Sequence, residues 1–339
     1  MIRMVLAYFR LICCLFFLLL PGLSHGQLTV GFLVPVSGLG DQSFNDITYA
    51  GLIRARNDFG LSLIIGQCQV GPLSHKVEME GLLREGADIV IANGYEFLDT
   101  VKEFANKNPD KIFILNDQAV SGYDNVVSTV FSQHEGAFLA GALAAMVSKE
   151  HRLGFVGGMD IPVIRSFLVG FQEGVDFIEE KTSVTINYLD RGGDIGTGFD
   201  NPALGYKVAH ELYDTNVDVI FSVAGLSGNG VIRAAAERKL YVIGVDADQD
   251  HMAKGYVLTS VMKRLDKAVY AVLSEIVAGR MVAGIHSFNL ENGGVSLTAM
   301  QFSKDLVTKE IRQRLLEVKE QIVNKKIIVT NYIKNATEN

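Results

Sequence analysis

From residue 27 onward, short apolar runs rich in β-branched residues alternate with longer stretches whose apolar residues recur at three- and four-residue spacing. The short runs predict strands and the longer stretches predict amphipathic helices. Several runs lack in/out alternation, which is typical of strands covered on both faces. The predicted strands are 28–35, 62–66, 88–92, 111–115, 126–130, 152–156, 183–189, 217–223, 240–245 and 256–261. The predicted helices lie near 45–58, 75–86, 98–108, 134–149, 163–179, 201–215, 229–238, 263–279 and 304–324.

The strict alternation of strand and helix predicts an α/β fold with parallel sheets and right-handed crossovers. The strands are too many for one ordinary open sheet, so we expect two sheets of about five or six strands each, hence two lobes. Short passages near 131–134, 259–263 and 285–292 would join them, because the sequence has no low-complexity linker. The predicted N-terminal lobe is 27–132 plus 262–287, and the predicted C-terminal lobe is 133–261 plus 288–334.

Residues 1–26 have the pattern of a secretory signal peptide. Arg3 and Arg10 give a positive start, 11–20 is apolar, and small residues at 24 and 26 precede a cleavage position at Gln27. The competing interpretation is a membrane anchor, but the apolar run is short for a span of about 20 residues. No cysteine follows the apolar run, so a lipid anchor is not expected.

Composition narrows the class of protein further. The net charge of −7 becomes more negative once the signal is removed, which argues against nucleic acid as a partner. Cys68 would be the single cysteine left, so we expect no internal disulfide and interpret Cys68 as a small core residue. The histidines are scattered without metal-ligand spacing, and neither a metal nor a cofactor is expected.

The loop 38–46 lies between a predicted strand and a predicted helix, where open α/β sheets bind ligands. It carries Phe44 beside short polar side chains, which suits a flat, polar, uncharged ligand. Its start resembles a dinucleotide fingerprint, but Ser43 replaces the third glycine, so a Rossmann dehydrogenase is disfavoured. The structural alternative is a helix start with Ser43 as cap and Asp46 three residues later.

The stretch 225–230 follows the predicted strand 217–223 and has three glycines. It fails the G-x-S-x-G nucleophile pattern because Asn229 stands in the last glycine position. We interpret it as a glycine-rich turn whose amides point at a ligand, and a purely structural turn is the alternative.

Two acids follow strands at their carboxyl ends, the ligand end of a parallel sheet. Asp246 opens a stretch that begins like a calcium loop, but His251 and Val257 stand where glycine and glutamate are needed. Asp246 could accept hydrogen bonds from a sugar diol, or it could form a helix cap or an Asx-turn. Asp117 is the equivalent acid in the first lobe.

Taken in order, these stretches resemble the basic-membrane-protein, purine-nucleoside-receptor family of ABC-transporter substrate-binding proteins. The first match is close to the family's D-x-S-F-N, and the matches extend over essentially the whole chain after residue 26. They are Asp41-Gln42-Ser43-Phe44-Asn45, Asn108-Pro109-Asp110 with 112–117, His134-Glu135-Gly136-Ala137-Phe138-Leu139-Ala140-Gly141, 154–158, Ala224-Gly225 with Gly228-Asn229-Gly230, 242–249 and Thr259-Ser260-Val261-Met262-Lys263.

The resemblance implies two Rossmann-like lobes joined by a three-crossing hinge, the type I periplasmic binding protein fold, with a nucleoside held in the cleft. It implies that Phe44 stacks on one face of the base and Phe199 on the other. Asn45 and Asp117 would hydrogen-bond the edge of the base. Stacking on an aromatic side chain contributes about 1–3 kcal/mol per base, so two phenyl rings suit this ligand.

For the sugar, the resemblance implies that Asp246 and Lys263 hold the ribose hydroxyls and that Gly225 offers a backbone contact. The sequence departs from the family in two places. Family members often have an aspartate a few residues before D-x-S-F-N, where residues 35–37 are Pro, Val and Ser here. Many members are also lipoproteins, whereas this chain lacks the lipid-modified cysteine and is expected to be free in the periplasm of a two-membrane cell.

The expected function is therefore a periplasmic, monomeric, non-enzymatic binding protein that delivers a nucleoside, with purine nucleosides as the expected class, to an inner-membrane ABC permease. A sensory receptor of the same fold that presents a nucleoside or related small molecule to a membrane sensor is the alternative. A secreted nucleoside hydrolase or dehydrogenase is disfavoured, because Asp117 and Asp246 have no recognisable activating partner in the sequence.

Overall fold

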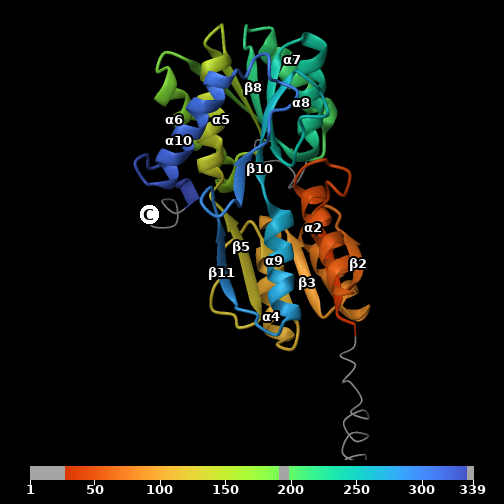
Figure 1. Cartoon of the computed structure of the whole chain (residues 1–339). Helices are drawn as coiled ribbons and strands as arrows, with labels where there is room; N and C mark the ends of the chain where they lie inside the picture. Colours follow the sequence, from red (N-terminus) through yellow and green to blue (C-terminus); the bar gives the residue numbers. More distant parts are fainter. Residues whose placement is uncertain (1–26, 191–197, 334–339) are drawn as a thin grey trace, which may run out of the picture.

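The computed structural model describes residues 27–190 and 198–333, so the predicted signal peptide lies outside the described residues. The described chain forms two six-stranded sheets. Figure 1 shows each sheet with its helices as a separate lobe, one above the other. The expected α/β class with two lobes is confirmed. Among the described residues, no helix combines the length and the apolar character that a membrane crossing requires.

All neighbouring strands of the first sheet run parallel. Helices α2 (Phe44–Phe59) and α9 (Leu265–Val277) cover one face, and α3 (Pro72–Arg84) and α4 (Leu98–Lys107) cover the other. Adjacent strand residues therefore enter opposite cores, as Phe32 and Leu33 do. The strand order is β11 (Gly284–Phe288), β5 (Val126–Phe131), β4 (Ile112–Asn116), β3 (Ile89–Asn93), β1 (Thr29–Val34) and β2 (Ser62–Gln67).

The second sheet repeats this plan, except that its edge strand β12 pairs antiparallel with β10. Helices α5 (Gln133–Val147), α6 (Pro162–Ile178) and α10 (Lys309–Val323) cover one face. Helices α7 (Pro202–Tyr213) and α8 (Gly225–Arg238) cover the other, on the opposite side in Figure 1. The strand order is β12 (Val295–Leu297), β10 (Val257–Lys263), β9 (Tyr241–Asp246), β8 (Val219–Val223), β6 (Arg152–Met159) and β7 (Ser183–Asp190).

The chain passes between the sheets after β5, after β10 and between β11 and β12. Two of these passages touch: the Ser132 N–H donates to the Phe288 carbonyl, and the rings of Phe131 and Phe288 stack with centroids 5.3 Å apart. β10 stays in the second sheet through Lys263, which pairs with Val295, so this passage comes later than the expected start of the N-terminal segment at 262. The lobe boundaries as a whole stay a prediction.

Strands β11 and β12, each at one edge of its sheet, and a short 3-10 helix, η1 (Tyr95–Phe97), were not among the predicted elements. β11 has one sheet neighbour, and its Ile285 is half exposed, so it lacks the continuous apolar run that marks a buried strand. β12 is three residues long, below the length at which periodicity can be recognised.

Candidate functional site

The carboxyl ends of strands from both sheets face one cavity between the lobes. The cavity and its mouth together hold about 760 Å³ of space free of protein atoms, open solvent included. All seven residues predicted for the site line it: Phe44, Asn45, Asp117, Phe199, Gly225, Asp246 and Lys263. The structure thus brings together side chains that are as far as 219 residues apart in the sequence, from Phe44 to Lys263.

The loop before α2 is held by Asp41 and not by Ser43. The buried Asp41 carboxylate accepts hydrogen bonds from the backbone N–H groups of Ser43, Asn45 and Asp46, at 2.9, 2.9 and 3.1 Å. Burial raises the pKa of Asp41 to about 6, against the lowering effect of these donors. Ser43 occupies the N-cap position of α2, as the structural alternative expects, but its side chain makes no capping hydrogen bond: the hydroxyl donates to Asp246 Oδ2 at 2.7 Å, across the cavity.

Two phenyl rings from different lobes line the cavity. Phe44 is the first residue of α2 in the first lobe, and Phe199 precedes α7 in the second. Gly158, at the end of β6, makes room for the Phe199 ring, because a Cβ there would clash with its edge. Helix α7 then starts with Asn201 as its cap, whose side chain accepts from the Leu204 N–H.

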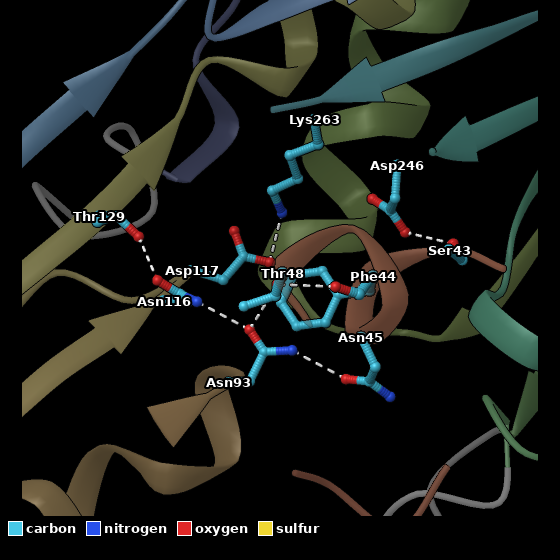
Figure 2. Close-up of polar contacts among 10 residues, drawn as sticks. All are labelled: Ser43, Phe44, Asn45, Thr48, Asn93, Asn116, Asp117, Thr129, Asp246 and Lys263. Carbon is cyan, nitrogen blue, oxygen red and sulfur yellow. Dashed lines mark hydrogen bonds and ion pairs between the residues drawn. The ribbon is translucent and has the colours of Figure 1, made fainter. Parts of the chain in front are cut away.

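A chain of amide and hydroxyl groups lies behind Asn45 (Figure 2). Asn45 Oδ1 accepts from Asn93 at 2.9 Å, Asn93 Oδ1 accepts from Asn116 at 2.8 Å, and Asn116 Oδ1 accepts from Thr129 at 2.7 Å. Asn93 and Asn116 end the neighbouring strands β3 and β4, Thr129 lies in the next strand, β5, and Asn45 lies in α2; all four are buried. Both N–H groups of Asn45 are also used, by Ser37 and by the carbonyl of residue 38. Asn45 therefore retains only acceptor capacity on its oxygen.

One buried cation lies among two acids at the centre of the site. Lys263 is 2% exposed, and its Nζ donates to Asp117 Oδ2 at 2.5 Å. Figure 2 shows Lys263 descending toward Asp117, with Asp246 on the other side. Burial raises the pKa of Asp246 to about 6, while the nearby Lys263 charge and the Ser43 hydroxyl lower it. Removing one partner of such a buried pair costs more than the pair contributes, because the other charge is left unpaired.

Aromatic rings surround the Lys263 ammonium as well. Its Nζ lies 5.3 Å from the ring centroid of Phe44, 5.4 Å from that of Phe131 and 5.8 Å from that of Phe167. The faces of these rings attract a cation and exclude water from it. The same ring, Phe44, thus borders both the ion pair and the open cavity.

The glycine-rich stretch 225–230 is not a turn but the start of α8, which corrects the predicted helix start at 229. Gly225 has a φ of 51°, a left-handed conformation that glycine adopts without strain, and it lines the cavity. Gly230 lies so close to the Pro202 carbonyl that a Cβ could not fit, which explains the glycine at this position. The stretch therefore presents a helix amino end to the cavity.

Several lining residues escaped the sequence argument. Tyr95 and Glu96 follow directly on β3, and the rule that ligands bind at strand carboxyl ends could have found them. An apolar wall from the second lobe includes Ile161, Ile164 and Phe167, at the start of α6. Nothing in their apolar pattern distinguishes them from core residues. Within residues 27–190 and 198–333, no group of three His, Cys, Asp or Glu side chains is arranged to hold a metal ion.

Comparison with known proteins gives a consistent result. A family model described as "ABC transporter substrate-binding protein PnrA-like" matches residues 28–332. Basic membrane protein A of Borreliella burgdorferi is 29% identical over 296 residues, 85% of this chain and 84% of that protein. The ABC transporter nucleoside-binding protein BmpA of Lactococcus lactis is 28% identical over 324 residues, 89% of each chain. The crystal structure of an ABC transporter solute-binding protein from Aeropyrum pernix superposes with a TM-score of 0.80 at 26% identity, covering 89% of this chain and 94% of that one.

Proposed function

This chain belongs to the PnrA-like family of ABC transporter substrate-binding proteins, and we propose that its own ligand is a purine nucleoside. The family is one of binding proteins and not of enzymes. In this proposal the chain closes its lobes on the nucleoside and delivers it to an inner-membrane permease. The name of the Lactococcus relative, a nucleoside-binding protein, supports a nucleoside as ligand.

The observation that carries the proposal is the pairing of two aromatic rings with buried acids in one interlobe cavity. Phe44 and Phe199 line the cavity from different lobes, so a planar base could contact both rings only when the lobes are close together. Stacking contributes about 1–3 kcal/mol per base without selecting one base. Closure would then be driven by contacts that exist only when both lobes touch the ligand.

Polar groups would fix the base and the sugar separately. Asn45 would accept a hydrogen bond from the base, since its N–H groups are already used within the protein. Asp117 would remain beside the base with Lys263 as its partner. Asp246 would accept from the ribose hydroxyls, Lys263 would donate to them, and Gly225 would contribute backbone contact.

The cellular setting belongs to the same proposal. Residues 1–26 would direct export and be removed, leaving a monomeric protein free in the periplasm, without a lipid anchor. The acidic net charge of −7 favours small-molecule over nucleic-acid partners. No catalytic step and no cofactor is part of the proposed cycle, which requires binding, hinge closure and release.

Titration calorimetry on ligand-stripped protein tests the proposal. Adenosine, guanosine and inosine should bind more tightly than cytidine, and free ribose should bind weakly, because most of the stacking area belongs to the purine. A mass spectrum of small molecules released on denaturing the purified protein should contain a nucleoside. Incubation with inosine should release no free base. Absence of binding by every nucleoside would refute the assignment of ligand, while leaving family membership intact.

A further inference from the structure

We propose that Glu96 selects the base, by accepting hydrogen bonds from the N1–H edge of guanine or hypoxanthine. This inference rests on the proposed function, since it names the part of the nucleoside that the site distinguishes. Four acids line the cavity: Asp41, Glu96, Asp117 and Asp246. The question is which of them remains free to bind a base.

Three of the four acids are already engaged. Asp41 accepts three backbone N–H groups before α2, Asp117 pairs with Lys263, and Asp246 accepts the Ser43 hydroxyl. Within the described residues, no side-chain hydrogen bond or ion pair joins Glu96 to another residue. Of the four acids, Glu96 is therefore the one whose carboxylate has no hydrogen-bonding partner residue within the described part of the chain, so both of its oxygens are available to a base.

The position of Glu96 matches the part of the cavity proposed for the base. Glu96 is in η1, directly after β3, and β3 lies between β1 and β4 in the sheet. The loops after β1 and β4 carry Phe44 and Asp117, so all three residues share one rim. Gly94 has a φ of 145°, and the Glu96 carboxylate lies against it where a Cβ would clash. A glycine at 94 is thus what lets this side chain fold back to the rim.

A carboxylate and a carboxylic acid prefer different purines. An ionised carboxylate only accepts, and its two oxygens match the N1–H and amino hydrogens of guanine, or the N1–H of hypoxanthine. Adenine has an unprotonated N1 beside its amino group, so an ionised carboxylate would face a lone pair. A protonated carboxyl carries one donor and one acceptor, which match that adenine edge.

The protonation state of Glu96 changes near neutral pH. Burial and, less strongly, the Asp117 charge raise the pKa of Glu96 to about 7. The Glu96 charge in turn acts on Tyr95 and Cys68, but the pKa values of both are raised to about 12, so they stay neutral near pH 7. Below pH 7 the protonated side chain would favour adenosine, and above pH 7 the carboxylate would favour guanosine and inosine. The ratio of guanosine to adenosine affinity should therefore rise with pH.

Calorimetry at pH 6 and pH 8 tests the inference on the wild-type protein and on Glu96→Gln, with the exposed Glu85→Gln as a matched control. In the wild type and the control, the guanosine preference should rise at least tenfold from pH 6 to pH 8, because the ionised fraction of a group with a pKa of about 7 rises about tenfold over this range while its protonated fraction falls about tenfold. In Glu96→Gln, guanosine should bind at least tenfold more weakly at pH 8, adenosine should bind equally or more tightly, and the pH response of the ratio should vanish. The glutamine amide is neutral at both pH values, and like the protonated acid it offers a donor and an acceptor.

1-Methylguanosine gives a second measurement that requires no variant. It lacks the N1–H, so at pH 8 the wild type should bind it at least tenfold more weakly than guanosine. If Glu96→Gln keeps the wild-type ratio and its pH response, or 1-methylguanosine binds as guanosine does, Glu96 does not read the base although the nucleoside proposal stands. If the wild type binds no nucleoside, the proposed function fails first and this inference fails with it.

Discussion

Asp117 and Asp246 are equivalent residues of the two lobes. Each follows or ends the third strand of its sheet, counted from the edge formed by β11 or β12, and their φ angles are 71° and 64°. Aspartate tolerates this left-handed region better than most residues, but it still costs about 1–3 kcal/mol when the surroundings impose it. The left-handed backbone at these two positions turns the chain sharply at the end of each strand, and both carboxylates line the same cavity.

Replacing Phe44 tests the stacking role. Phe44→Ala removes the ring that would cover one face of the base, so nucleoside affinity should fall at least tenfold, given about 1–3 kcal/mol per stacked base. Phe44→Tyr keeps the ring and should bind within a few-fold of the wild type. Calorimetry with inosine measures both, and circular dichroism checks the fold. Equal affinity in the wild type and Phe44→Ala would remove Phe44 from the site.

Replacing Asp246 tests the sugar contact. Asp246→Asn should weaken inosine binding by about tenfold or more, because hydrogen bonds to a charged group contribute about 1.5–3 kcal/mol. The same substitution should hardly change the binding of 2′,3′-dideoxyinosine, which lacks both hydroxyls. The two proteins and two ligands form a double-mutant cycle that isolates the contact. An equal loss for both ligands would show that Asp246 acts on the cavity as a whole and not on the ribose.

At this scale the sequence located side chains but not their partners. Asp117 and Asp246 could be predicted, because the ends of parallel strands mark ligand sites. The pairing of Lys263 with Asp117, and of Ser43 with Asp246, could not, because each contact joins different lobes and depends on how the lobes meet. The same rule could have found Glu96, which lies just after β3, but the absence of a hydrogen-bonding partner residue for its carboxylate within the described residues is visible only in the structure.

Among the helices, α5 and α6 approach each other through glycines. Gly170 lies against the backbone carbonyl of His134, Gly174 against that of Phe138, and Gly141 against that of Phe171. A Cβ at any of these positions would overlap a backbone atom, which cannot move aside as a flexible side chain can. The residues that a helix-propensity argument would penalise are thus required by the packing of these helices.

Two glycine-to-alanine substitutions should therefore have opposite effects. Gly170→Ala should lower the free energy of unfolding by about 1–3 kcal/mol or more, because the helices must separate. Gly81→Ala, in α3, has open space around the added methyl and should raise it by about 0.5–1 kcal/mol through helix propensity. Urea unfolding measures both. A stabilised Gly170→Ala would mean that α5 and α6 can adjust without cost.

Element prediction succeeded where burial was uniform. The central strands, such as β3 and β8, are buried at every position, and their continuous apolar runs could be recognised. The start of α8 was missed because glycines at 225, 228 and 230 suggest a turn. The structure explains two of them by close contacts, Gly228 with β8 and Gly230 with α7. Strands β11 and β12 were missed, although the edge strands β2 and β7 were predicted, because β11 has no continuous apolar run and β12 has only three residues.

At the scale of the whole molecule, the second lobe forms hydrogen bonds to the loop 41–43 of the first lobe. Besides the contact from Ser43 to Asp246, Asn229 donates to the backbone carbonyl of residue 41 at 3.2 Å, and Gln249 donates to that of residue 42 at 3.1 Å. These bonds join residues about 200 positions apart, which no local sequence pattern encodes. They describe a closed arrangement, in which the loop that carries Phe44 is fixed from both sides.

Asn229→Asp should weaken ligand binding by shifting the lobes toward an open arrangement. The carboxylate would face the carbonyl of residue 41 with no proton to donate, so repulsion would replace a hydrogen bond that contributes about 0.5–1.5 kcal/mol. The second lobe itself should stay as stable, since an acid near the amino end of α8 is favourable and Asn229 is only partly buried. Apparent affinity should fall about threefold or more, in proportion to the closed population.

Small-angle scattering of the ligand-free Asn229→Asp protein should give a larger radius of gyration than the wild type, and saturating nucleoside should restore the wild-type value. Asn57→Asp, an exposed change in α2, is the matched control and should change neither quantity. Wild-type affinity and scattering in Asn229→Asp would show that this contact does not govern closure.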